Sequence, residues 1–320
     1  MRHEKLCNRR NRWLGACNHG ASVIFFYDIK MNGNDETDLF ACYVQKKKSI
    51  SMKSNRLSSG IYHGKTKGGY YKMEVKVLNT SDELGKTAAI HAAEVLRAAI
   101  KERGRARLTL STGASQLDFF KHFVEADLDW SKVEMFHLDE YVDLPETHPA
   151  SFRKYLKERF LAHVAVERYA LVNGEGDIRR NIEELNARLT EAPIDLALIG
   201  IGENAHVAFN DPPADFDTEE PYLVVNLAES CKQQQVGEGW FPSNEDVPKQ
   251  AITMSIRQIL KSAVILSCVP YRVKANAIKL TLENELTNHI PSTILKTHPQ
   301  WTLYLDRESA SAVDAGLLEA

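Results

Sequence analysis

From Glu74 to the end of the 320-residue chain, short apolar runs alternate with segments of helical periodicity. The apolar runs are continuous, which is typical of parallel strands that are covered on both faces. Thr80 and Glu83 form a capping box at the start of the first expected helix, and Gly104 is typical of a helix end. The pattern predicts an α/β fold in which a doubly wound, mainly parallel sheet carries helices on both faces.

The bounds of the expected elements follow from this hydrophobic periodicity. Strands are expected at residues 73–79, 107–111, 133–138, 170–172, 194–202, 222–227, 251–255, 263–269 and 302–306. Helices are expected at residues 81–103, 116–126, 150–164, 178–189 and 271–284.

Residues 1–70 differ from the rest of the chain in charge. They carry 13 Lys and Arg against 5 Asp and Glu, whereas residues 71–320 carry 27 against 38. The first segment is also polar, rich in Gly and Ser, and without helical or strand periodicity. We therefore expect residues 1–73 to be a basic, poorly ordered extension and residues 74–320 to form one domain.

Composition argues against several classes of partner. The acidic main body offers no basic face for nucleic acid. No apolar run approaches the roughly 18 residues that span a bilayer, and no cleavage site follows the short run Ala21–Tyr27 that faintly imitates a signal peptide. The cysteines are odd in number, scattered and without zinc-site spacing, so we expect reduced thiols in a cytoplasmic protein: Cys7, Cys17, Cys42, Cys231 and Cys268.

Ligands of a parallel sheet bind beyond the carboxyl ends of its strands, where three loops of this chain are expected. The first loop consists of small residues between an expected strand and helix. Backbone amides and hydroxyls in such a loop bind phosphate, although ordinary strand–helix turns have the same composition. The residues concerned are Thr112, Gly113, Ala114 and Ser115.

The second loop begins with Asp139 and Glu140 at the end of an apolar strand. Because adjacent side chains of a strand point to opposite faces, only one of the two carboxylates is expected to face a ligand. A carboxylate at this position serves as a general base, a helix cap or an ion-pair partner, and the residues alone do not separate these roles.

The third loop combines Gly200 and Gly202 with Asn204, His206 and Asp211. The glycines allow a sharp turn and a close approach of backbone to a ligand, and a histidine titrates near neutrality. A single histidine in a loop is more often structural. One that stands beside an amide and a carboxylate at a strand end instead indicates an active site.

Taken together, the three loops resemble the glucosamine-6-phosphate deaminase (isomerase) family. The family's patterns PTGGTP, MDEY-x-GLP followed by HP-x-S, and G-x-GxDGHIAFNEP correspond here to STGASQ, LDEYVDLPETHPASF and GIGENAHVAFNDPP. With LKTHPQWTLYLD matching the family's closing segment, the resemblance covers most of residues 74–310. It implies the fold of deaminases and ribose-5-phosphate isomerase, an amino-sugar phosphate as substrate, and no metal or organic cofactor.

The resemblance also implies roles for the matching residues. Asp139 is the base that moves a proton from C2 to C1 of the open-chain sugar, and His206 moves a proton during ring opening. The implied catalytic residues are Asp139, Glu140, Asn204, His206 and Asp211. The implied phosphate ligands are Thr112, Gly113, Ala114, Ser115, Lys274 and Lys232, of which the last replaces the family's arginine.

Two positions depart from the family's pattern. Asn204 and Ala205 replace the Asp–Gly of DGH, and Asp211 replaces a glutamate. An amide cannot accept a proton at neutral pH, so Asn204 acts only through hydrogen bonds. Asp211 is one methylene shorter than glutamate, and a misplacement of about 1 Å can cost about 10²-fold in rate. The sequence therefore leaves open whether Asp211 polarises His206.

The expected function is conversion of glucosamine 6-phosphate and water to fructose 6-phosphate and ammonia, in cytoplasmic amino-sugar catabolism. A 6-phosphogluconolactonase shares the fold but has ASLFP and DER where this chain has AFNDP and DEY. Further alternatives are an isomerase of another sugar phosphate and a non-catalytic sugar-phosphate sensor. A sensor would normally carry a DNA-binding helix pair, which residues 1–70 do not suggest. Each reading makes a sugar phosphate the partner and leaves homo-oligomerisation open.

Overall fold

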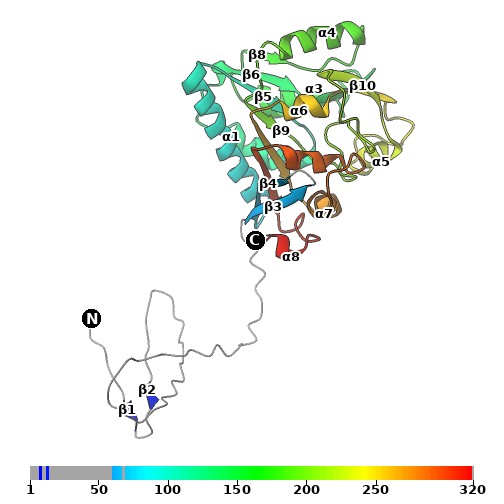
Figure 1. Ribbon diagram of the computed structural model, residues 1–320. Helices are drawn as coiled ribbons and strands as arrows, with labels where there is room; N and C mark the ends of the chain where they lie inside the picture. Colours follow the sequence, from blue (N-terminus) through cyan, green and yellow to red (C-terminus); the bar gives the residue numbers. More distant parts are fainter. Residues whose placement is uncertain (1–6, 9–11, 14–59, 67–68, 319–320) are drawn as a thin grey trace. The chain divides into compact units, whose positions relative to one another are not determined.

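The computed structural model describes residues 7–8, 12–13, 60–66 and 69–318 (Figure 1). Residues Arg56–Ala320 form one compact unit. In the other unit, Met1–Asn55, β1 (Cys7–Asn8) pairs antiparallel with β2 (Arg12–Trp13). Most of the extension for which poor order was expected, including the signal-like run at 21–27, falls outside the described residues, whereas residues 60–66 and 69–73 are described and belong to strands.

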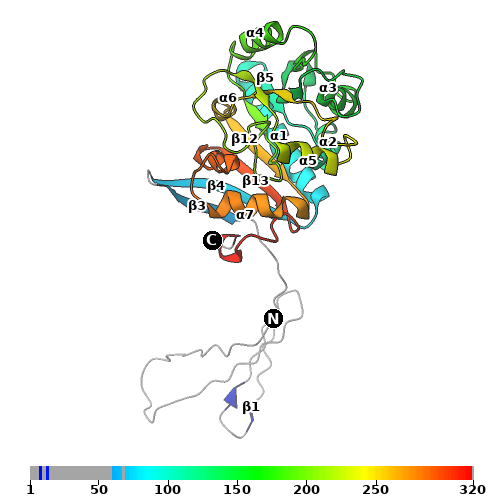
Figure 2. The same cartoon turned by 90° about the vertical axis from the view of Figure 1, so that its right-hand side faces the viewer.

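The larger unit is built around an eight-stranded sheet in the order β3-β4-β13-β12-β9-β5-β6-β8. All neighbouring strands are parallel except β3, which pairs antiparallel with β4 at one edge (Figure 2). The expected fold class is confirmed. The strands are β3 (Gly60–Thr66), β4 (Gly69–Leu78), β5 (Ala106–Leu110), β6 (Val133–His137), β8 (Arg168–Ala170), β9 (Leu196–Leu198), β12 (Val264–Val269) and β13 (Trp301–Asp306).

The sheet includes residues before the expected domain start at Glu74. β3 pairs along its length with β4, from Gly60 opposite Val75 to Thr66 opposite Gly69. Residues 60–66 contain two glycines and show no sustained alternation of apolar and polar residues, so hydrophobic periodicity did not indicate a strand there. The segment forms a strand because its backbone pairs with β4 at the edge of the sheet.

A second, antiparallel sheet has the order β10 (Tyr222–Asn226), β11 (Gln250–Met254) and β7 (Asp139–Tyr141). Leu138 connects it to the large sheet, because its amide donates to the Leu110 carbonyl and its own carbonyl accepts from the Met254 amide. Asp139 therefore opens a new strand, whereas the sequence placed it at the end of β6. A continuous apolar run does not reveal that its backbone changes partners at one residue.

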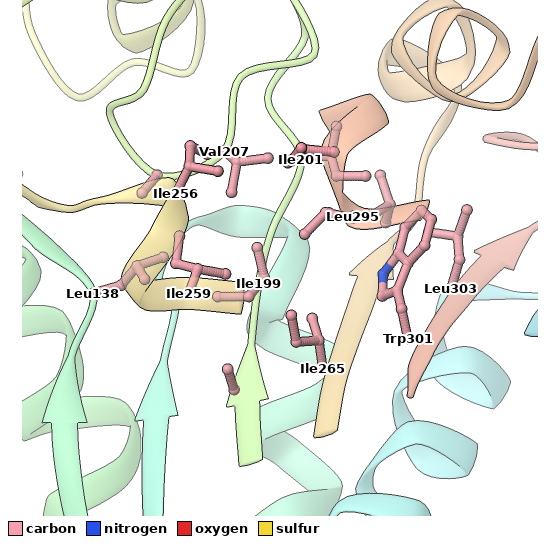
Figure 3. Packing of buried hydrophobic residues seen from close by; sticks show 14 of the residues in the cluster. Leu138, Ile199, Ile201, Val207, Ile256, Ile259, Ile265, Leu295, Trp301 and Leu303 are labelled. Carbon is pink, nitrogen blue, oxygen red and sulfur yellow. The ribbon is translucent and has the colours of Figure 1, made fainter. Parts of the chain in front are cut away.

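The helices cover both faces of the large sheet (Figure 1). Side chains of β9 alternate between two cores, since Leu196 and Leu198 face one and Ala197 faces the other. The core around Leu196 is shared with α1 (Ser81–Arg103), α2 (Leu117–Phe123) and α3 (Phe152–Leu156), which continues as η3 (Lys157–Leu161). The opposite core, drawn in Figure 3, is shared with α4 (Ile178–Leu189), α6 (Ile256–Leu260), α7 (Ala275–Glu283), η5 (Pro291–Thr297) and α8 (Ala315–Leu318).

The ends of α1 confirm the capping residues expected from the sequence. The Thr80 hydroxyl accepts from the Glu83 amide at 3.1 Å, and the Glu83 carboxylate accepts from the Asn79 amide at 3.0 Å. Gly104 follows the helix in the left-handed region, at φ 77°, where a side chain would be strained. Among the residues that the structure describes, no helix has the length and apolar character needed to cross a bilayer.

The strand order locates the point where the chain changes direction across the sheet. From β5 the chain moves outward through β6 to β8, and from β9 it moves the other way through β12 to β13. β5 and β9 are neighbours, so their carboxyl-end loops separate and leave a crevice between them. These are the loops that begin at Ser111 and Ile199.

Candidate active site

A cavity of about 720 Å³ lies at the carboxyl ends of β5, β6, β9 and β12. This volume suits a small organic ligand. Eight of the residues expected in a site line it: Thr112, Gly113, Ala114, Ser115, Asp139, Asn204, His206 and Lys274. Three others do not line it: Glu140, Asp211 and Lys232.

The end of the cavity beside the loop after β5 is suited to an anion. The backbone amides of Thr112 and Gly113 donate to no carbonyl of the described residues. Lys274, at the end of η4 (Arg272–Lys274), is 6% exposed, and its ammonium forms no ion pair within the described part of the chain. Burial lowers the pKa of Lys274. A buried cation without a partner is costly, and a phosphate would relieve that cost.

Lys232 is placed differently from what the sequence indicated. It belongs to α5 (Glu229–Gly237), and its ammonium lies 2.7 Å from the Glu229 carboxylate one turn earlier. Lys232 is shorter than the family's arginine and pairs with the neighbouring Glu229, and both features keep it off the cavity wall. Its position in the family's pattern did not show this. The phosphate role of Lys232 has no support from this arrangement.

Asp139 lines the cavity yet is 6% exposed. No described residue donates a hydrogen bond to its carboxylate. Burial, reinforced by the charge of Glu140, raises the pKa of Asp139 from 3.8 to about 8. A carboxyl that gains neither donors nor a cation from the protein is free to exchange a proton with a ligand.

Glu140 points the other way and is fully buried. Its carboxylate accepts from the Ser151 hydroxyl at 2.8 Å, from the Arg153 amide at 2.8 Å and from the Phe152 amide at 3.2 Å, at the start of α3. The Arg153 guanidinium completes the set at 3.3 Å. Glu140 therefore holds β7 against α3. The geometry corrects its expected place among the catalytic residues, because it meets no cavity surface.

Asn204 stands between His206 and Asp211. Its amide nitrogen donates to Asp211 Oδ1 at 3.0 Å, and its oxygen lies 2.6 Å from His206 Nδ1. An ionised carboxylate only accepts hydrogen bonds, so Asp211 fixes which way the Asn204 amide faces. The amide oxygen then accepts from His206 Nδ1, which must carry a proton. The lone pair of a neutral His206 is therefore on Nε2.

Asp211 lies behind the cavity wall and still reaches the histidine. Its Oδ1 is 3.4 Å from His206 Nδ1. Burial opposes ionisation of Asp211, but hydrogen bonding and charge from His206, together with the Asn204 amide, outweigh it and lower the carboxyl pKa. The Asn204 amide thus bridges the gap that the shorter Asp211 side chain leaves, so Asp211 can still act on His206.

Gly202 fixes the place of the His206 ring. A Cβ at Gly202 would lie 2.1 Å from His206 Cε1 and 2.2 Å from Nε2, so the ring occupies the space of the missing side chain. At Gly200, two residues earlier, a Cβ would meet nothing closer than 3.7 Å. The position of the His206 ring therefore requires a glycine at 202, whereas no close contact requires one at 200.

The sequence did not indicate the wall that α5 contributes. Ser230, Gln233, Gln234 and Gln235 line the cavity, and Glu238 and Trp240 follow them. The segment has little hydrophobic periodicity, and only Cys231 and Gln235 of α5 are buried. A run of three glutamines in an otherwise mixed segment was the available signal. Ser111, whose buried hydroxyl has no partner, also lines the cavity and was missed.

Within the described part of the chain, one group of side chains has ligand atoms close enough to hold a metal ion: those of His206, Asp211 and Cys231.

A doubly wound sheet with a cavity at its switch point, a buried lysine and a shielded carboxyl is the arrangement of an enzyme that acts on small phosphorylated molecules. Residues 79–304 match the family described as glucosamine-6-phosphate isomerases/6-phosphogluconolactonase, and the chain belongs to that family.

Named relatives point to one branch of the family. The chain is 34% identical over 252 residues to glucosamine-6-phosphate deaminase of Thermoanaerobacter pseudethanolicus, covering 75% of this chain and 95% of the relative. It is 36% identical over 240 residues to glucosamine-6-phosphate deaminase of Streptococcus sanguinis, covering 75% and 98%.

Solved structures agree. One described as a monomeric glucosamine-6-phosphate deaminase is 30% identical, with a TM-score of 0.68, and covers 74% of this chain and 99% of its own. A putative 6-phosphogluconolactonase from Neisseria gonorrhoeae is 17% identical, with a TM-score of 0.60 and coverage of 72% and 98%, and shows a likeness of fold.

Neutralising the adjacent carboxyls of Asp139 and Glu140 should change the free energy of unfolding in opposite directions. The folded pKa of Asp139, about 8, exceeds its unfolded value of 3.8, so its contribution to stability is complete below about pH 4 and lost as pH rises through about 8. Asp139→Asn is expected to raise the free energy of unfolding near pH 9 and to change it little near pH 4. Urea denaturation at both pH values measures this.

Glu140→Gln is expected to lower the free energy of unfolding by about 1–3 kcal/mol, because an amide nitrogen replaces an oxygen that accepts buried hydrogen bonds, while Arg153 keeps its ion pair with Glu175. Glu175→Gln is the matched control, since Glu175 is a 45% exposed partner of the same arginine and is expected to contribute at most about 1 kcal/mol. Equal effects of Asp139→Asn, Glu140→Gln and Glu175→Gln would contradict the burial assigned to the first two carboxyls and the exposure assigned to the third.

Proposed function

We propose that this cavity converts glucosamine 6-phosphate and water to fructose 6-phosphate and ammonia. The observation that carries the proposal is a cavity with a buried, unpaired lysine near one loop and a shielded carboxyl and a tautomer-fixed histidine on the others. Family membership and relatives named as deaminases across almost their whole length support the same activity.

In the proposed reaction, Lys274 and the amides of Thr112 and Gly113 bind the phosphate. His206 Nε2 accepts the proton of the C1 hydroxyl and passes it to the ring oxygen as the ring opens, while Asn204 and Asp211 stabilise the imidazolium that forms in between. Asp139 then removes the proton from C2, a proton of the C2 ammonium moves to O1, and Asp139 returns its proton to C1, which leaves an iminium at C2. Water adds to this carbon and ammonia leaves, so that the enzyme returns to its starting protonation state.

The second candidate is lactone hydrolysis. That reaction needs activated water and no proton transfer between carbons, and the solved lactonases are similar to this chain in fold alone. A carboxyl with a pKa raised to about 8 favours proton transfer from a carbon acid instead. The presence of this carboxyl also argues against a sensor without catalysis.

We place the reaction in a reducing, cytoplasmic compartment. Cys231 and Cys268, the cysteines of the larger unit, are buried free thiols.

Ammonia release from glucosamine 6-phosphate tests the proposed activity directly. We expect turnover with this substrate and none with N-acetylglucosamine 6-phosphate, whose acylated nitrogen is a poor leaving group. Galactosamine 6-phosphate tests selectivity at C4, and 6-phosphogluconolactone tests the lactonase candidate. Lactone hydrolysis without ammonia release would refute the proposal.

The pH profile should report Asp139. Because the free carboxyl has a pKa of about 8 and must be ionised to act as a base, kcat/KM is expected to rise with pH to a plateau above about 8. The charge of Glu140 contributes to that raised pKa, so Glu140→Gln should move the rise to lower pH. The substrate amine also titrates, but identically with both proteins. A profile that Glu140→Gln leaves in place would assign the rise to the substrate.

Substitutions of the two glycines should separate His206 positioning from general loop tolerance. Gly202→Ala is expected to lower kcat by about 10²-fold or more, since its Cβ would displace the His206 ring. Gly200→Ala should stay near wild type because its Cβ makes ordinary contacts at 3.7 Å or beyond. Initial rates of both variants decide the point. Similar losses in both would show that the loop, and not the ring, is sensitive.

A further inference from the structure

Behind the cavity wall, three potential metal ligands face one another. A ring nitrogen of His206, an Asp211 carboxylate oxygen and Cys231 Sγ all lie within 4.8 Å of one another. His206 Nδ1 and Asp211 Oδ1 are 3.4 Å apart. Zinc bonds of about 2.0–2.1 Å at tetrahedral angles place nitrogen and oxygen ligands about 3.3–3.4 Å apart. Two of the three ligands therefore already have the required separation.

The third ligand packs in a hydrophobic cluster and is otherwise unpartnered within the described residues. Cys231, on α5, is 1% exposed, and its thiol makes no hydrogen bond to the described residues. Asn204 Oδ1 lies 2.6 Å from His206 Nδ1, a hydrogen-bond distance shorter than the separation of two zinc ligands, so it is not counted among them. His206 and Asn204 line the cavity, which gives an ion a path to the group. Imidazole, carboxylate and thiolate together favour Zn²⁺ over Mg²⁺ or Ca²⁺.

We propose that His206, Asp211 and Cys231 form an inhibitory Zn²⁺ site. The metal binds the nitrogen of the catalytic histidine that faces away from the substrate. The inference of inhibition rests on the proposed function, whereas the inference of metal binding does not.

Metal binding at Nδ1 would change which nitrogen of His206 carries the proton. Zn²⁺ takes the Nδ1 lone pair, so the single proton of the neutral ring moves to Nε2. The Cys231 thiol loses its proton to solvent and binds as thiolate. No oxidation occurs. With a proton on Nε2, His206 can no longer accept one from the sugar, although the cavity and its phosphate end stay open.

Cobalt spectroscopy on the full chain tests the site without any assay of activity. Co²⁺ added to the wild-type protein should give a thiolate-to-cobalt charge-transfer band, and Zn²⁺ should abolish it by displacement. Cys231→Ser is expected to remove the band and to weaken Zn²⁺ binding at least about 100-fold, since even outer partners of a metal site are worth 10–100-fold. Cys268→Ser, at the other buried thiol, should change neither.

The N-terminal cysteines are present in all three proteins and cancel in the comparison. A band that persists in Cys231→Ser, or that Cys268→Ser removes equally, would overturn the site. Zinc X-ray absorption on the wild-type protein needs no variant and covers the case in which Cys231→Ser does not fold. It should show one sulfur at about 2.3 Å and nitrogen or oxygen at about 2.0–2.1 Å, and a shell without sulfur would refute the proposal.

Kinetics then test the mode of inhibition. Zn²⁺ should lower kcat of the wild-type deaminase and leave KM within about twofold, because the substrate still binds. Cys231→Ser should retain wild-type turnover and lose the sensitivity to Zn²⁺. Inhibition that competes with substrate would overturn the proposed mode. A cobalt band in a protein that releases no ammonia would instead mean that the metal site stands and the proposed function fails.

Discussion

The change of backbone partner at Leu138 determines where the chemistry can occur. Its amide pairs with the large sheet and its carbonyl with the small one, so the chain leaves β6 and enters β7 within a single residue. Because side chains alternate along β7, Asp139 turns toward the cavity and Glu140 turns into the interior. A slip of one residue in this pairing would exchange the two carboxyls and remove the base from the cavity.

This geometry stabilises one carboxylate and isolates its neighbour. Glu140 receives backbone amides, a hydroxyl and a guanidinium, and thereby holds α3 in place. Asp139 receives none of these and lies near the charge of Glu140, which contributes to its raised pKa. The protein therefore gives up stability at Asp139 above neutral pH, whereas at Glu140 hydrogen bonds offset part of the cost of burial, which still raises the pKa of that carboxyl. Such a division is expected where a buried acid must exchange protons with a ligand.

Much of the fold followed from the sequence because it depends on local rules. The alternation of apolar runs with helices, the Thr80 cap and the strand-end loops were all visible without any tertiary information. The expectations that failed concerned long-range strand pairing or the direction in which a side chain points. β3 is a strand through its pairing with β4, and Lys232 was placed at the cavity by its position in a motif although it pairs with Glu229. The wall formed by α5 was missed because few of its residues are buried.

Asn204 connects the departure from the family's pattern with the metal site. A carboxylate at this position would stand beside Asp211, and the repulsion between the two charges would favour a protonated histidine. The neutral amide avoids this repulsion, spans the distance to the shorter Asp211 and accepts a hydrogen bond from His206 Nδ1 at 2.6 Å. The same amide is a weaker zinc ligand than a carboxylate, so a metal ion can compete with the proton for His206 Nδ1. The substitution that fixes the useful tautomer of His206 is thus the one that makes this tautomer sensitive to zinc.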